Sequence, residues 1–371
     1  MSRPHHLILT VDLEVFGNGS GCVQQCACAP LERMARLVEA YGARLEIFVE
    51  AIEFAVMEGD PAHADTVRAV KRQLADMVRR GHQLQIHIHP QWDGAYPDDA
   101  KQGWVFKGGT WRTGDTDPDR LVHLLHMSNA WIREAVQEVH EDYGCSVFRA
   151  GGWCIQPSEE VVPVLRSMGL NIDSSVAPGL ANDDPDTWYD FRSSPEKPWW
   201  RVDAEVDRPG SGDFIEVPIA APRVNAARHL RARVARRREG EFAPGCVGTY
   251  SGRKGGMQGI SRIWKKARDA RRAMLDYCTL PADLMIDGIQ EWIGRFGEVD
   301  GPIPVVAIGH TKNFSESAER ELEKLLVWVS EQDSLRIDSY RGWYETVIGK
   351  SATVSGPAKQ RQDGESLRGR M

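Results

Sequence analysis

Two histidines spaced two residues apart carry the clearest chemical signal in the sequence. They lie in Leu84–His89 (LQIHIH), whose alternation predicts a strand with its apolar side chains on the buried face. His87 and His89 then share the opposite face, where two imidazoles can bind one metal ion. Pro90 ends the strand, and Trp92 supplies an aromatic wall beside it. The alternative interpretation is a pair of hydrogen-bonded histidines at a strand end.

Two carboxylates have the same spacing at the end of an earlier strand. Asp12 and Glu14 in TVDLE can leave that strand on one side. One carboxylate can then ligate a metal while the other takes a proton, because two acids held close together divide their roles. Taken alone, the motif is more typical of a pair of solvated acids at a strand end.

Two further predicted strands also end in residues that could take part in a reaction. Arg149 in FRAGGW can hold a catalytic carboxylate in its charged form, and Gly151 and Gly152 let the backbone approach a ligand closely. The alternative is a tight turn beside an exposed Trp153. His310 follows a late apolar run, and on its own it would indicate a structural histidine.

These residues can act together only in a fold that brings the ends of their strands close to one another. Short apolar runs alternate with helical patterns, a rhythm that predicts a parallel sheet, open or closed into a barrel. The expected strands are Leu7–Asp12, Leu45–Ala51, Leu84–His89, Ser146–Arg149, Asn171–Ser175, Phe214–Ile219 and Pro304–Gly309. The expected helices are Leu31–Ala43, Val67–Arg80, Arg120–His140, Glu159–Met168 and Glu316–Glu331. Because active sites of such folds form at the carboxyl ends of the strands, all four motifs are expected on one side.

Charge is distributed unevenly along the 371 residues. The chain has 46 Lys and Arg against 53 acids, a net charge of −7 that argues against a general nucleic-acid coat protein. The window 223–272 holds 15 basic residues and 3 acids, a local charge of 15 − 3 = +12. We expect this window to lie near the mouth of the pocket and to bind an anionic group, such as a nucleotide diphosphate, a lipid phosphate or a membrane surface. It carries no nucleic-acid recognition motif.

The sequence has no run of eighteen apolar residues that would span a membrane and no secretory signal, so we expect a cytoplasmic protein. Residues 1–350 are expected to form one domain with a basic helical insertion at 223–303, and 351–371 a disordered tail. The seven cysteines do not indicate a disulfide framework. Cys22, Cys26 and Cys28 lack a fourth ligand for a metal.

The motifs TVDLE, HIHPQW, FRAGGW and DSSV, followed by a late strand ending in His310, resemble those of the polysaccharide deacetylases, carbohydrate esterase family four. The resemblance covers residues 5–350, with the motifs in order. It implies a distorted (β/α)7 barrel of parallel strands, here with the basic segment inserted before the last barrel strand. It also implies a divalent metal, usually zinc, and hydrolysis of an N-acyl group from an amino sugar.

The same resemblance implies roles for single residues. Asp12 takes the position of the general base, and His310 that of the acid that protonates the leaving amine. Arg149 orients the base, and Trp153 lines the pocket. The predicted substrate contacts are Trp92, Gly151, Gly152 and Trp153.

The metal ligands depart from the family pattern. Leu13 stands where the pattern has a second acid, so Glu14 is the acid left to complete a triad with His87 and His89. Gln91 stands four residues after His87, where the pattern has its second histidine. One carboxylate and two imidazoles still make a sensible three-ligand zinc site with an open position.

The sequence therefore predicts a metal-dependent amidohydrolase that removes an acetyl or another small acyl group from an amino sugar. The substrate would be free, nucleotide-linked or lipid-linked, as an intracellular precursor of a surface glycan. Two alternatives stay open: a glycoside hydrolase on a similar seven-stranded barrel, using two carboxylates, and a non-catalytic carbohydrate-binding descendant. Bound zinc with acyl release would distinguish the first function from the other two.

Overall fold

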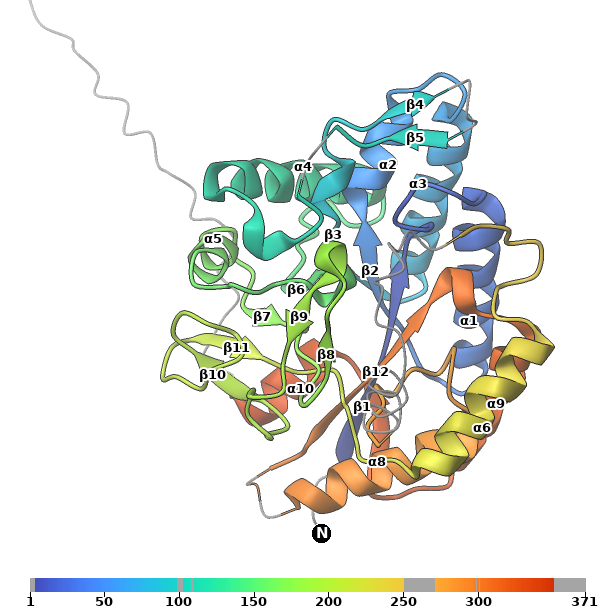
Figure 1. Cartoon of the computed structure of the whole chain (residues 1–371), viewed down its shortest axis with the longest axis vertical. Coiled ribbons are helices and arrows are strands. Elements are labelled where there is room, and N and C mark those ends of the chain that lie inside the picture. The colour runs from blue at the N-terminus through green and yellow to red at the C-terminus, as the bar shows by residue number, and fades with distance from the viewer. Residues whose placement is uncertain are drawn as a thin grey trace, which may run out of the picture.

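The computed structural model describes residues 4–98, 103–107, 110–249, 271–297, 299 and 301–349. Its centre is a curled sheet of parallel strands surrounded by helices (Figure 1). The predicted tail at 351–371 and residues 250–270 of the basic window lie outside the described residues. None of the described helices is long and apolar enough to cross a membrane.

Seven parallel strands form the core of the sheet. They are β1 (His5–Leu13), β2 (Glu46–Glu50), β3 (Gln83–Ile88), β6 (Val147–Ala150), β7 (Ile172–Asp173), β11 (Phe214–Glu216) and β12 (Pro304–His310). Their order is β11-β7-β6-β3-β2-β1-β12, and each overlaps one of the seven strands expected from the sequence. The apolar runs predict them well because these strands are buried on both faces.

The two ends of this order are brought together by isolated bridges. Ile219, just beyond β11, bridges Val306 of β12 in parallel, and Ala220 N donates to Val306 O at 3.0 Å. Asp276 bridges Ile308 of the same strand. The fold is therefore a distorted (β/α)7 barrel, as predicted.

Further strands extend or flank the barrel. β10 (Trp200–Val202) pairs antiparallel with β11, and β13 (Leu335–Asp338) pairs parallel with the first half of β1. Two small hairpins lie apart from the main sheet, β4 (Tyr96–Asp98) with β5 (Gly103–Val105) and β8 (Ala181–Asn182) with β9 (Tyr189–Asp190).

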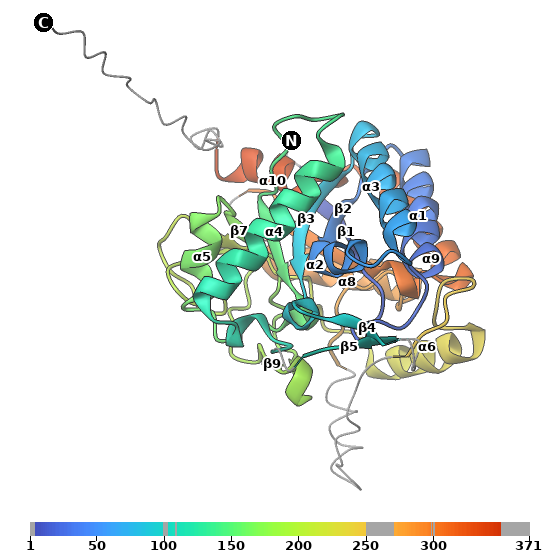
Figure 2. The same ribbon diagram turned by 90° about the horizontal axis from the view of Figure 1, so that it is seen from above.

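The helices lie outside the sheet (Figures 1 and 2). They are α1 (Ala29–Ala40), α2 (Ala51–Glu58), α3 (Ala64–Arg79), α4 (Pro118–Val136), α5 (Val161–Ser167), α6 (Ala226–Glu239), α8 (Ala282–Phe296), α9 (Glu316–Ser330) and α10 (Tyr340–Val347). The five helices expected from the sequence correspond to α1, α3, α4, α5 and α9. In α3, for example, the predicted stripe of Val67, Val70, Leu74 and Met77 is buried.

Short helical turns follow three of the barrel strands directly. They are η2 (Pro90–Trp92) after β3, η4 (Gly151–Trp153) after β6 and η6 (Thr311–Asn313) after β12. Similar turns lie at η3 (Thr113–Asp115) and η5 (Pro185–Thr187), and a short π-helix, η1 (Gln24–Cys28), precedes α1. Three of the four predicted site motifs therefore span the end of a strand and the turn that comes after it.

Candidate metal centre and its surroundings

Strand register aligns the chemically active residues across the barrel. Asp12 lies opposite His310 between β1 and β12, and His87 lies opposite Arg149 between β3 and β6. Residues two apart on one strand face the same side. The register therefore brings the residues of all four motifs to the carboxyl ends of the strands, as the sequence predicts.

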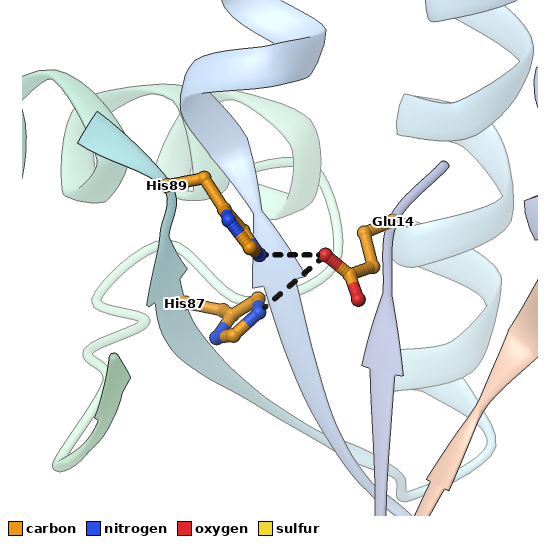
Figure 3. A group of neighbouring side chains, drawn as sticks. All are labelled: Glu14, His87 and His89. Atoms are coloured by element: carbon orange, nitrogen blue, oxygen red, sulfur yellow. Dashed lines mark ion pairs between the residues drawn. The ribbon is translucent and has the colours of Figure 1, made fainter. Parts of the chain in front are cut away.

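Glu14, His87 and His89 form a buried cluster (Figure 3). Glu14 Oε2 lies 2.8 Å from His89 Nε2 and 3.7 Å from His87 Nε2. The candidate ligand atoms all lie within 4.8 Å of one another. Both Nε2 atoms are buried and share this one carboxylate oxygen as their neighbour, yet neither makes a hydrogen bond of good geometry with it, an arrangement that an ion bound by all three would satisfy. The three residues therefore fit a divalent ion, with one carboxylate and two imidazoles as donors.

Hydrogen bonds outside the cluster orient its members. His87 Nδ1 lies 2.9 Å from Arg149 O, so it donates to that carbonyl and leaves the lone pair on Nε2. The buried amide of Gln91 lies 3.3 Å from His89 Nδ1, so this departure from the family pattern contacts a predicted ligand. Gly151 also contacts the cluster, because a Cβ there would lie 2.6 Å from the ring of His89. This close approach explains a glycine at that position.

A lysine completes the surroundings of Glu14. Lys312 Nζ donates to Glu14 Oε1 at 2.6 Å and to Val15 O at 3.0 Å. Burial alone would raise the pKa of Glu14, but Lys312 and the two histidines hold it well below its usual value. Glu14 is therefore a charged carboxylate, the form that binds metals.

Asp12 lies beside this cluster in a charged pair. Arg149 Nη1 donates to Asp12 Oδ1 at 2.7 Å and to Thr10 Oγ1 at 3.0 Å, and both charged side chains are buried. Burial raises the pKa of Asp12, but Arg149, followed by the two histidines His87 and His310, lowers it below the ordinary value. Asp12 is thus ionised and able to accept a proton.

His310 lies on the other side of Asp12. Its Nε2 is 3.5 Å from Asp12 Oδ2 and 4.0 Å from Glu14 Oε1. Burial lowers the pKa of His310, the charge of Lys312 adds to that shift, and the charges of Asp12 and Glu14 oppose it in part. The imidazole is therefore neutral near neutral pH and can exchange a proton with a bound group.

The predicted substrate contacts fall into two groups. Trp153 packs edge-on against His310, with ring centroids 5.9 Å apart, and Gly151 and Gly152 form the turn that leads to it. Trp92 is fully buried and packs edge-on against Trp104 and Phe106. The structure gives Trp92 a packing role, so its contact with a substrate stays a prediction.

Sequence reasoning missed three titratable residues near the centre, Lys312, Glu50 and Glu53. Lys312 lies in an otherwise ordinary turn, two residues after His310. Glu50 and Glu53 are buried, and burial raises the pKa of each well above its usual value, so both are neutral acids. Glu53 accepts a hydrogen bond from Val15 N and so fixes the chain next to Glu14. Of these residues, Glu50 could have been found from the sequence, because it is an acid at the end of a predicted strand, as Asp12 is in β1.

The basic window approaches the site through the segment after α6. Phe242 packs edge-on against Phe16, and Ala243 N donates to Lys312 O at 2.9 Å. Cys246 forms a disulfide with Cys26, a single bond that the cysteine spacing did not predict. Cys26 is thereby removed from any cysteine metal site with Cys22 and Cys28. The segment 240–249 thus borders the site, whereas binding of an anionic group there stays a prediction.

Comparisons with known proteins show similarity at the level of structure only. No family model and no curated protein sequence matches the chain. A solved structure named for a polysaccharide deacetylase from Mycobacterium smegmatis shares 12% identity, with 92% of this chain and 89% of that chain covered and a TM-score of 0.47. The Bc1960 peptidoglycan N-acetylglucosamine deacetylase shares 8% identity over 94% of each chain, with a TM-score of 0.39.

A third similar structure carries a different functional description. BA3943 from Bacillus anthracis, a CE4 family pseudoenzyme, shares 10% identity over 91% of this chain and 69% of that chain, with a TM-score of 0.37. Polysaccharide deacetylases are thus among the solved structures that the chain resembles, as its ordered motifs predict. At these identities the likeness concerns the fold, so the function is argued from the site.

Proposed function

We propose that the chain is a metal-dependent amidohydrolase that removes an acetyl or another small acyl group from an amino sugar. The observation that carries the proposal is the pair of buried imidazoles whose Nε2 atoms both point at one oxygen of Glu14. An ionised Asp12 and a neutral His310 lie next to them, so a metal site adjoins a proton acceptor and a second titratable group. Amide hydrolysis needs this combination.

Glu14, His87 and His89 would hold the metal, and their donor set favours Zn²⁺. A divalent ion there would polarise the amide carbonyl and acidify a water molecule. Lys312 keeps Glu14 ionised, and the Arg149 carbonyl holds His87 in the tautomer that offers Nε2. These contacts favour ligand geometry before any ion arrives.

Asp12 would accept the proton of the attacking water. Its salt bridge to Arg149 fixes the carboxylate through Oδ1 and leaves Oδ2 toward His310. His310, neutral in the resting site, would take up the proton that Asp12 removes from water, since its Nε2 lies 3.5 Å from Asp12 Oδ2, and would pass a proton to the departing amine. Its lowered pKa makes the imidazolium formed in this way a ready donor. Trp153, beside His310, would contact the sugar ring.

The ionised state of Asp12 and Glu14 is an argument against a glycoside hydrolase. That reaction needs one carboxyl group that stays protonated as general acid near a second carboxylate. Asp12 and Glu14 are each held ionised by a buried cation, Arg149 and Lys312 respectively. Neither acid of the predicted pair is therefore suited to donate the proton.

The proposal also includes the form of the substrate and the location of the protein in the cell. A free, nucleotide-linked or lipid-linked amino sugar would be the substrate, and the cytoplasm the expected location. The Cys26–Cys246 bond is the observation that weighs against a cytoplasmic location, because disulfides persist in oxidising compartments.

The decisive experiment measures acetate released from a panel of N-acetyl amino sugars, free and linked to nucleotide or lipid, by protein loaded with zinc. Chelator-treated protein is the control. Zinc-dependent release supports the proposal. Sugar binding with bound zinc and no release would instead support a non-catalytic descendant, and cleavage of the glycosidic bond would support a hydrolase.

A further inference from the structure

Helix α6 presents apolar side chains to solvent. Leu230 and Val234 are 41% and 50% exposed, and Val247 in the segment that follows is 81% exposed. These are three of the six large apolar side chains that are exposed among the described residues. Figure 2 shows α6 at the edge of the molecule. The inward side of α6 is fixed by the buried His229 and by Ala232, which packs on the core.

The arginines of α6 divide into two sets by their partners. Arg228 faces α8, where it donates to Asp283 at 2.6 Å and to Asp287. Arg236 donates to the carbonyl of Glu241 at 3.2 Å. In contrast, the exposed Arg231, Arg233 and Arg238 have no hydrogen bond or ion pair with any of the described residues. Free cationic charge is therefore concentrated on the outward side of the helix.

The outward side has a regular arrangement. At about 100° per residue, Leu230 and Ala227 lie within about 40° of Val234 around the helix axis. Arg231 and Arg238 flank this apolar strip on one side, and Arg237 and Arg233 flank it on the other. An apolar strip bordered by arginines is the pattern of helices that lie in a lipid interface, with the apolar side chains among the acyl chains and the cations at the headgroups.

We propose that α6 is a docking surface for an anionic phospholipid membrane. The free arginines supply charge complementarity to lipid phosphates, and Leu230 and Val234 supply the apolar contact that a soluble polyanion would not need. The remainder of the protein outside the 223–272 window carries −7 − 12 = −19, so it would be repelled from such a surface. The basic helix therefore determines which face approaches the lipid.

Membrane docking would favour one of the proposed substrates, the lipid-linked amino sugar. This part of the inference rests on the proposed function. The chain from the end of α6 to Thr249 runs directly to the site, where it packs on Phe16 and hydrogen-bonds Ser20. The disulfide to Cys26 fastens this connection. A site joined to a membrane-bound helix by so short a segment suits an amino sugar carried on a lipid.

Sedimentation with vesicles tests the docking without any assay of catalysis. Full-length protein is mixed with vesicles of phosphatidylcholine alone and with vesicles in which phosphatidylglycerol replaces part of it. We expect binding only to the anionic vesicles and loss of binding as salt is added. The variant R231E/R233E/R238E should lower the partition coefficient at least about a hundredfold, because each basic residue contributes about fivefold and reversal adds repulsion.

A matched charge reversal on other faces is the control. R133E/R201E/R341E changes the net charge by the same amount on α4, β10 and α10, where the three arginines are exposed. It should keep most of the binding. Equal binding of the two triple variants would overturn the proposal, as would equal binding of the wild-type protein to neutral vesicles or no vesicle binding at all.

A second variant separates a membrane from a soluble polyanion. L230S/V234S leaves every charge in place and changes two exposed side chains, so folding is retained. It should weaken vesicle binding severalfold while leaving the retention on a heparin column unchanged. Vesicle binding as strong as that of the wild-type protein would overturn the proposal in favour of an electrostatic partner. Acetate release from a lipid-linked sugar, measured separately, tests the substrate step: failure there with vesicle binding intact would reject the proposed function and not the docking.

Discussion

Lys312 and Glu14 form a buried ion pair at the edge of the candidate metal centre. The ammonium group contacts Oε1 at 2.6 Å, which leaves Oε2 directed at the two imidazoles. Both side chains are 6% exposed, so water screens the pair little. The lysine thereby selects which oxygen is available to a metal and keeps the carboxylate charged.

This pair predicts that Lys312→Met weakens zinc binding. Without the ammonium group, burial favours the neutral acid of Glu14, and the carboxylate loses its orientation. Loss of such an outer contact typically costs about ten- to a hundredfold in metal affinity. Titration of metal-free protein with Zn²⁺ measures the change, and Lys312→Arg should restore part of it.

Lys71→Met is the matched control for this experiment. Lys71 is also a partly buried lysine in ion pairs, with Glu58 and Glu134 at 2.9 Å each, but it lies on α3. Its loss should change stability and leave zinc affinity unaltered. Wild-type affinity in Lys312→Met would show that Glu14 is oriented by other contacts or is not a ligand.

Gly151→Ala is predicted to disturb the same centre from the opposite side. The new Cβ would lie 2.6 Å from the His89 ring, closer than real contacts allow, so the imidazole must move. We expect zinc affinity to fall by at least about tenfold, because ligand placement sets affinity. Gly144→Ala, whose Cβ meets nothing within 4 Å, is the control and should bind zinc normally. Unchanged binding in Gly151→Ala would remove His89 from the ligand set.

The seven parallel strands could be predicted from the sequence because they are short, apolar and buried on both faces, whereas their closure into a barrel was implied by the family resemblance. The register then followed, since strand-end residues of parallel strands meet at one edge. A basic helical insertion was predicted at 223–303, but the bounds of α6 within it were not, because its many arginines leave only Leu230 and Val234 as large apolar residues and so no strong 3.6-residue period. The role of Lys312 was equally hidden, since a lysine in a turn is normally solvated and only the fold shows that it is buried against Glu14. The disulfide joins residues 220 positions apart, which local spacing does not indicate.

Glu46 predicts a pH dependence of stability. This buried carboxyl accepts hydrogen bonds from Gln85 Nε2 at 2.8 Å and from Tyr340 N at 3.1 Å. Burial, opposed by these bonds, raises its pKa from 4.5 to about 7. Between these two values the unfolded chain loses the proton while the folded chain keeps it. The contribution of Glu46 to stability is therefore full below pH 4.5 and falls as the pH rises to 7.

Glu46→Gln should consequently raise the free energy of unfolding more at about pH 8 than at about pH 5, by up to about 3 kcal/mol. Denaturant titrations at the two pH values measure the difference. Glu345→Gln, on the exposed face of α10, should give equal changes at both pH values. The prediction fails if the effect of Glu46→Gln is also independent of pH.

Asp12 and Glu14 should respond differently to loss of charge. In Asp12→Asn the amide oxygen can still accept the Arg149 hydrogen bond, but the side chain cannot take a proton from water. We expect kcat for acetate release to fall at least about a hundredfold with zinc content unchanged. Glu14→Gln removes a charged ligand, so zinc affinity should fall first and turnover only in consequence.

Added zinc separates the two roles. Excess metal should restore part of the activity of Glu14→Gln, because its defect is occupancy of the centre. It should not restore Asp12→Asn, whose centre is already filled and whose defect is in proton transfer. The geometry supports this division, since Glu14 Oε2 is 2.8 Å from His89 Nε2, whereas Asp12 is bound to Arg149 and lies next to His310. Rescue of Asp12→Asn by zinc would reverse the assignment and make Asp12 the ligand.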